Sequence, residues 1–199
     1  MCARVEEQGG RVALRSLRWG APPYRSSILC RAGDRLELKG LGKSRRRPRA
    51  VWVDEFSMSG YLLPRAHLRR LGVDLGAVLL AEKLAGSFEA CLAEVIEGDA
   101  DITACFSAAA QAARPRAGYA ELLGPRAAEL RVLAYTAECP TDGIVLSPRL
   151  APDAAAELAE ALRRLLEVRP SAKQLAALFD VDGFAEATPG AFRGVADLI

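Results

Sequence analysis

The stretch over residues 50–64 constrains the fold of this chain more than any other. A short apolar run ends at Asp54, and an amphipathic segment follows the turn that comes next. Between them stand two hydroxyls and a glycine, namely Ser57, Ser59 and Gly60. This order predicts a buried strand, a tight turn and the start of a helix.

Two interpretations of this turn are open from the residues alone. A turn that opens a helix points backbone N–H groups and serine hydroxyls at one spot, with the positive end of the helix dipole behind them. Such a spot suits a small oxyanion, namely phosphate, phosphonate, sulfate or carboxylate. In the other interpretation, Ser57 or Ser59 only caps the helix.

Composition excludes several classes of protein. The 199 residues are 51% hydrophobic and 26% charged, which is typical of a globular protein, and the net charge of +2 predicts no polyanionic partner. No apolar run approaches the ~20 residues that span a bilayer. The N-terminus carries two acids and no apolar core, so it is not a signal peptide, and we expect a cytoplasmic protein if Met1 is the true start.

Cysteine and histidine offer little for catalysis or metal binding. The five cysteines are widely spaced without a Cys-x-x-Cys pair, so neither a zinc site nor a disulfide framework is indicated. Cys30, Cys91 and Cys105 lie in apolar surroundings and are expected in the core. The single histidine, His67, is expected on a solvated helix face, and one histidine leaves little for a catalytic triad.

Hydrophobic patterns along the chain predict strands that alternate with helices, which favours an α/β layer architecture with a partly parallel sheet. The expected strands cover residues 26–31, 50–54, 77–81, 101–106, 130–136 and 143–147. The expected helices cover residues 61–71, 88–97, 152–168 and 171–179, the last of them capped by Ser171. Residues 108–123, alanine-rich and broken by Pro115 and Gly118, are expected to form a helix followed by a loop.

Two charged stretches are interpreted as structural. The basic run over residues 43–49 is a short loop without interleaved aromatic residues, so a solvated loop is favoured over a nucleic-acid patch. Asp99 and Asp101 flank one alanine, so an extended chain would point them to opposite sides. A turn is therefore a better interpretation of the two acids than a metal or acid–base pair.

Several segments, in order, resemble a known family, the substrate-binding component of phosphate, phosphite and phosphonate ABC transporters (the PhnD-like proteins). Residues 23–26 resemble its Tyr-x-Ser hinge strand, and residues 54–64 its Asp-Pro-x-Ser-Thr-Ser-Gly-Tyr/Phe-Leu-x-Pro signature. Further similar segments cover residues 86–101, 130–145 and 179–184. The resemblance runs from about residue 5 to the end of the chain.

The resemblance implies a type II periplasmic-binding fold that captures its ligand between two lobes without catalysis. It implies one complete lobe, a mixed sheet flanked by helices, and part of the second lobe. Residues 1–32 would form the end of the first lobe and the hinge strand, residues 33–112 the second lobe with the serine turn, and residues 113–199 the return to the first lobe.

The resemblance also implies ligand-binding residues, with no metal and no cofactor. The serine turn holds the phosphonate oxygens in such proteins, and a hinge tyrosine and an aspartate line the cleft from other sides. The positions that match here are Tyr24, Ser57, Met58, Ser59, Gly60, Phe88 and Asp142.

Four positions depart from the family pattern. Met58 replaces a threonine and Phe88 replaces a histidine, which removes polar donors, and Glu55 replaces a proline beside the turn. Ala108 stands where aminoalkylphosphonate binders carry a glutamate, which argues against a ligand with an amino group. The expected pocket is therefore more apolar and less cationic than that of its relatives.

The resemblance implies a small oxyanion and an ABC permease as partners, an extracytoplasmic location, and no nucleic acid. A homo-oligomer is also expected, because an incomplete first lobe would expose sheet edges and apolar surface. The alternative is a ligand-sensing or degenerate partner-binding module of the same fold. An enzyme is disfavoured, because the chain contains no phosphate-binding Gly-x-x-x-x-Gly-Lys loop.

Overall fold

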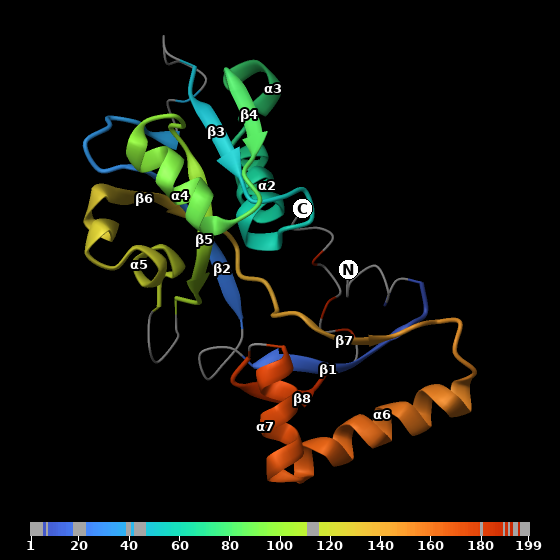
Figure 1. The fold of residues 1–199 in the computed structure, drawn as a ribbon. Helices are drawn as coiled ribbons and strands as arrows, with labels where there is room; N and C mark the ends of the chain where they lie inside the picture. Colours follow the sequence, from blue (N-terminus) through green and yellow to red (C-terminus); the bar gives the residue numbers. More distant parts are fainter. Residues whose placement is uncertain are drawn as a thin grey trace. The chain divides into compact units, whose positions relative to one another are not determined.

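The computed structural model describes residues 6, 8–17, 23–38, 41, 47–110, 116–179, 181–188, 190, 192 and 195. The chain forms two compact units (Figure 1). Unit 1 contains residues 1–23 and 139–197, and unit 2 contains residues 24–138 with 198–199. The lobe boundaries expected at residues 32 and 112 stay predictions. No helix in the described part of the chain is long and apolar enough to cross a membrane.

Unit 2 is built around two small sheets. The first contains β2 (Tyr24–Arg31) between β5 (Thr103–Ala108) and β6 (Leu130–Tyr135), and all of its pairs are antiparallel. The second pairs β3 (Arg49–Trp52) in parallel with β4 (Ala81–Leu84). A parallel bridge from Ala50 to Ile102 joins β3 to the segment that leads into β5.

Helices cover both faces of these strands. On one face, Ile28, Trp52 and Ile102 pack against Leu68 of α2 (Leu63–Arg70). On the other face, Val51 and Cys105 pack against Leu92 of α4 (Phe88–Glu97). Unit 2 also contains the shorter helical segments α3 (Leu75–Val78), α5 (Gly118–Leu123) and η3 (Gly124–Glu129). Alternate residues of β3 therefore serve opposite cores, as the period of a strand requires.

Unit 1 has an antiparallel sheet of its own. Its central strand is β1 (Arg11–Leu17), which lies between β7 (Gly143–Leu146) and β8 (Gly183–Glu186). Two helices follow β7, namely α6 (Pro152–Glu167) and α7 (Arg169–Leu178). The core of unit 1 is small, with Ala13, Leu14 and Leu146 of the sheet packed against Ala159 of α6.

Most predicted elements are confirmed, and their ends differ from the predicted ones by at most three residues. The predicted helix over residues 88–97 is α4, and Gly98 ends it in the left-handed region, with φ of 88°. The helix predicted over residues 152–168 is α6, and the strands predicted near residues 26, 50, 101, 130 and 143 are β2, β3, β5, β6 and β7. Cys30, Cys91 and Cys105 are buried as expected, and so is Cys139.

Three predictions are wrong. The stretch over residues 77–81 is not a strand, because the Asp74 carboxylate accepts from the N–H groups of Gly76 and Ala77 and starts α3. No helix begins at Ala108, because β5 runs to Ala108 opposite Tyr24, and α5 begins only at Gly118. Residues 111–115 of that predicted segment lie outside the described part of the chain. Ser171 is not a cap, because α7 already begins at Arg169.

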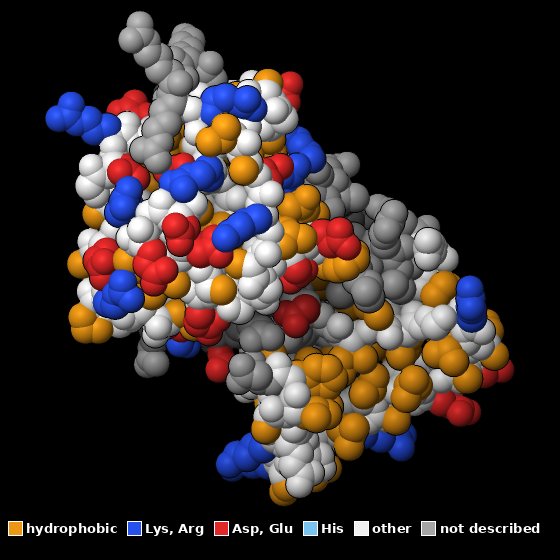
Figure 2. All heavy atoms as spheres, turned by 45° about the horizontal axis from the view of Figure 1, so that its top comes forward, with side chains coloured by type: hydrophobic (Ala, Val, Ile, Leu, Met, Phe, Trp, Pro, Cys, Tyr) orange, Lys and Arg blue, Asp and Glu red, His pale blue; other side chains and the backbone are white. Residues whose placement is uncertain are grey.

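Part of the predicted basic loop over residues 43–49 is used inside unit 2. The Arg47 side chain donates to the carbonyls of Gly76 and Leu79, and Arg49 binds Asp101. Residues 43–46 lie outside the described part of the chain. On the face that Figure 2 shows, basic and acidic side chains are interspersed over unit 2, which agrees with the low net charge.

Asp101 fastens the start of β3 to the turn after α4. Its carboxylate accepts from the Arg49 backbone N–H at 2.7 Å, from Arg49 Nε at 3.1 Å and from Arg49 Nη2 at 3.3 Å. Asp101 is 5% exposed, whereas Asp99 is exposed. The turn predicted for the two acids is confirmed, and only Asp101 has this structural role.

We predict that Asp101→Asn lowers the free energy of unfolding by about 1–3 kcal/mol, because buried hydrogen bonds to a charged donor are weakened. Asp99→Asn is the matched control, and it should change stability by less than about 0.5 kcal/mol. Urea unfolding followed by circular dichroism measures both. Equal effects of the two substitutions would contradict this role for Asp101.

Candidate functional site

The serine turn begins where β3 ends. The Asp54 carboxylate accepts from the Phe56 N–H at 2.8 Å, and the Asp54 carbonyl accepts from the Ser57 N–H at 3.3 Å. This local pattern is an Asx turn, which aspartate favours because its short side chain reaches the backbone two residues on. It reverses the chain and delivers Ser57 to the start of a helix.

Ser57 caps that helix, as one of the two interpretations of the sequence requires. Ser57 has extended backbone angles, and its Oγ accepts from the Gly60 N–H at 3.1 Å. The helical run opens as a π-helical turn, η2 (Met58–Leu62), and passes directly into α2. It therefore begins three residues before the predicted helix at residue 61.

The cap leaves two donors of the turn unused. The backbone N–H groups of Met58 and Ser59 make no hydrogen bond within the described residues. The first turn of the helix contains no acidic residue that would compete for its positive end. Capping and anion binding are therefore compatible here, because they use different N–H groups.

Ser59 supplies a third unused donor. The residue is 7% exposed, and its backbone carbonyl accepts from Ser26 Oγ of β2 at 2.6 Å. The Ser59 hydroxyl makes no hydrogen bond within the described residues. It is also not among the fully buried side-chain atoms of these residues that lack a partner. A hydroxyl in so buried a residue ordinarily has a partner, so this one is suited to a ligand.

Gly60 is required by the close approach of β3. A Cβ atom at this position would lie 2.6 Å from Val53 Cγ2 and 2.8 Å from Ser57 Oγ. The Gly60 carbonyl also accepts from the Val53 N–H at 3.4 Å. The glycine thus allows the strand, the cap and the first helical turn to pack together.

Two neighbouring side chains at the turn are exposed. Glu55 is exposed, and Phe56 is 82% exposed although it precedes the cap, where an apolar residue often packs against the helix. The ring of Tyr61, four residues after the cap, instead meets the Trp52 ring edge-on at 6.5 Å and lies under the Arg65 guanidinium. Phe56 is therefore left as an aromatic group beside the unused donors.

Tyr24 lies on the same strand as Ser26, the residue that contacts the turn. It is the first residue of β2, half-buried, and opposite Ala108. Residues two apart in a strand share a face, so Tyr24 is on the face whose Ser26 hydroxyl reaches Ser59. The role of Tyr24 as a ligand contact stays a prediction.

Phe88 and Asp142 occupy different surroundings. The Phe88 ring meets the Phe106 ring edge-on at 5.3 Å and packs against the core under α4, so it serves packing. Asp142 belongs to unit 1, where its Oδ1 accepts from Ser16 Oγ of β1 at 3.0 Å and its carbonyl accepts from the Ser16 N–H at 2.8 Å. Their roles as ligand contacts stay predictions.

Sequence reasoning missed the residues that support the turn. These are Ser26, which orients Ser59, and Glu82 of β4, which accepts from Trp52 Nε1 at 2.8 Å and pairs with Arg65. Ser26 carried a signal in the hinge-strand resemblance, two residues after Tyr24. Glu82 carried none, because its partners lie far away in the sequence.

Other titratable groups do not form a second site in unit 2. Burial raises the pKa of the Cys91 thiol to about 11 and raises that of Cys105 as well, so both stay protonated and unreactive. Burial, followed by the nearby Arg70 charge, lowers the pKa of His67, which is half-buried rather than fully solvated. The described residues contain no cluster of ligands able to hold a metal ion.

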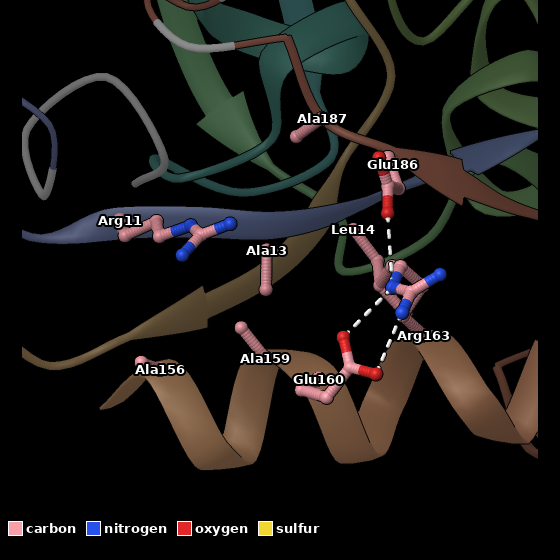
Figure 3. Close-up of a pocket in the computed structure, with 9 residues that line it drawn as sticks. All are labelled: Arg11, Ala13, Leu14, Ala156, Ala159, Glu160, Arg163, Glu186 and Ala187. Atoms are coloured by element: carbon pink, nitrogen blue, oxygen red, sulfur yellow. Dashed lines mark hydrogen bonds and ion pairs between the residues drawn. The ribbon is translucent and has the colours of Figure 1, made fainter. Parts of the chain in front are cut away.

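The cavities of unit 1 are separate features. One of about 160 Å³ lies between β1, α6 and the end of β8, where Arg163 pairs with Glu160 and Glu186 (Figure 3). A second, of about 400 Å³, is lined by Ala176 of α7, Phe184 of β8 and Val181 between these two elements, among other residues. Neither contains a residue predicted to bind the ligand.

Comparison with known proteins decides the family. A family model described as the periplasmic substrate-binding protein of phosphonate ABC transporters matches residues 2–192. The chain belongs to this family. It therefore has a solute-binding role and the fold of type II periplasmic binding proteins. None of the curated proteins matches it in sequence.

Several solved structures share the fold. XAC2383 from Xanthomonas citri, bound to ATP, aligns with a TM-score of 0.79 at 20% identity, over 98% of this chain and 72% of that protein. A phosphonate transporter binding protein from Pseudomonas aeruginosa (PA3383) aligns at 0.69 and 19% identity, over 98% and 63%. PhnD1 from Prochlorococcus marinus, with methylphosphonate, aligns at 0.64 and 20% identity, over 95% and 70%.

We predict that Gly60→Ala destabilises unit 2 by about 1–3 kcal/mol, because the added methyl group must displace Val53 or Ser57. Gly33→Ala is the matched control, since a Cβ there meets nothing within 4 Å, and it should be neutral or slightly stabilising. Thermal unfolding measures both variants. A neutral Gly60→Ala would show that the turn is not as tightly packed as described.

Proposed function

We propose that this protein binds a small tetrahedral oxyanion of the phosphonate, phosphite or phosphate class at the serine turn. The observation that carries the proposal is a set of donors at one helix start that make no hydrogen bond within the described part of the chain: the N–H groups of Met58 and Ser59, and the Ser59 hydroxyl. Oriented donors at the positive end of a helix are a ready anion site. Ser57 holds the turn in place through its bond to Gly60.

The surroundings support an oxyanion whose substituent is apolar rather than cationic. Phe56 is exposed beside the turn, and Met58 adds a thioether in place of a hydroxyl. Ala108 is 4% exposed and faces Tyr24 across the sheet, so this position provides no acid to pair with an amino group. We therefore expect methylphosphonate or the inorganic anions to bind better than 2-aminoethylphosphonate.

The proposal includes Tyr24 of unit 2 as a further ligand contact, whereas the roles of Asp142 in unit 1 and of Phe88, which packs against Phe106, stay predictions from the sequence. It also places the protein outside the cytoplasm as a partner of an ABC permease, without catalysis, as the family role supports. Two structural neighbours were solved with ligands that contain phosphorus oxyanions, ATP and methylphosphonate, which agrees with this ligand class. The degenerate or sensing module remains the alternative that the binding experiment decides.

We predict that Ser59→Ala abolishes ligand binding with little effect on stability, because the lost hydroxyl makes no hydrogen bond to any residue that the structure describes. Ser57→Ala should also weaken binding but cost about 0.5–2 kcal/mol of stability through the lost cap. A thermal-shift assay with phosphate, phosphite, methylphosphonate, 2-aminoethylphosphonate and sulfate measures both effects. A ligand at ~100 times its dissociation constant adds about 2.7 kcal/mol to wild-type stability.

Ser171→Ala of α7 is the control, and it should retain the full ligand-induced shift. If no anion shifts a cooperatively unfolding wild-type protein, the degenerate module is the better account. A shift that survives in Ser59→Ala would place the anion elsewhere.

A further inference from the structure

Helix α6 of unit 1 has an apolar face that is wider than the side that packs against the sheet. One side of the helix packs on the sheet through four residues, Ala155, Ala159, Leu162 and Leu166. A globular helix ordinarily buries one apolar stripe and presents polar residues elsewhere. On α6, apolar residues continue around the helix next to the buried side.

We call this second set of residues the α6 stripe. It consists of Ala154, Leu158, Ala161 and Leu165, all of which are exposed. Leu158 is 44% exposed and Leu165 41%, and Val168, 53% exposed, follows the helix with extended backbone angles. In Figure 2, hydrophobic side chains gather over the side of unit 1 that carries α6. Within the described residues, nothing covers the stripe.

The spacing of the stripe matches a helix–helix seam. Successive members are four, three and four residues apart, which is the a/d repeat with which two helices interlock. Leucine alternates with alanine along it, so large residues on one helix can face small ones on another. The stripe is therefore shaped for a second helix.

The charges beside the stripe select a second copy of the same helix. Glu157 and Arg164 lie seven residues apart on one flank. In an antiparallel pair related by a two-fold axis near Ala161, Glu157 of each copy meets Arg164 of the other, which gives two equivalent ion pairs. In a parallel pair of α6 helices, neither Glu157 nor Arg164 would face a side chain of opposite charge.

Both charged groups are available for this pairing. Glu157 makes no ion pair within the described residues, and the Arg164 side chain is 72% exposed while it contacts Glu160 at 3.0 Å. An isologous two-fold interface needs such self-complementarity, in which residue i meets residue j and j meets i. The α6 stripe satisfies this condition.

We propose that the α6 stripe is an interface at which two copies of this chain associate through antiparallel α6 helices. The contact buries apolar residues that are exposed in one copy and adds the two Glu157–Arg164 pairs. It is carried by unit 1 alone and does not depend on the ligand or the serine turn. The interface is small, so the dimer should be concentration-dependent.

Sedimentation equilibrium between about 1 and about 100 µM protein tests the proposal. We expect wild type to shift from monomer to dimer in this range and Leu165→Asp to stay monomeric with an unchanged circular dichroism spectrum. Glu157→Arg and Arg164→Glu should each weaken the dimer about tenfold, and the double variant should recover to within about threefold of wild type. Glu97→Arg, an exposed charge reversal on α4, is the control and should leave the dimer unchanged.

A cross-link gives an independent readout. Ala161→Cys in a Cys2→Ser background should form a disulfide-linked dimer on mild oxidation, because Ala161 lies next to the two-fold axis and the other cysteines are buried. Moving the cysteine to the exposed Ala156, outside the stripe, should abolish the cross-link. A chain that stays monomeric throughout would overturn the proposal and leave the stripe to a different polypeptide. A dimer that Leu165→Asp and the charge reversals do not affect would also overturn it.

Discussion

The close contact of Gly60 with Val53 and Ser57 is the constraint on which the candidate site depends. It brings the end of β3 against the first helical turn, so the Ser57 hydroxyl reaches the Gly60 N–H. Because that cap uses only one donor, the N–H groups of Met58 and Ser59 stay available at the positive end of the helix. A side chain at residue 60 would separate the parts that create this arrangement.

The rest of unit 2 holds the turn in place. Ser26 in the central strand donates to the Ser59 carbonyl, which fixes the turn against the sheet. Trp52 is fully buried directly before the turn, and its indole N–H is satisfied by Glu82. Donors that are oriented before the ligand arrives cost little ordering on binding, which is why a rigid scaffold suits an anion site.

Local patterns predicted the strand, turn and helix at residues 50–71, because caps and hydrophobic periods act over a few residues. They did not reveal how distant segments meet. The Ser26–Ser59, Phe88–Phe106 and Ser16–Asp142 contacts depend on sheet register, which no local pattern encodes. Strand pairing likewise overrode the helix start expected at Ala108, and a single Asp74 cap turned an expected strand into α3.

The most direct test of the serine turn as the anion site is a titration of ¹⁵N-labelled protein with methylphosphonate, followed by amide NMR. The account predicts that the amide signals of Met58 and Ser59 move furthest, because their N–H groups gain a charged acceptor while the capped Gly60 amide moves less. Saturable shifts centred on amides outside residues 57–60 would contradict it, as would a folded protein whose amide signals do not respond to any phosphorus oxyanion.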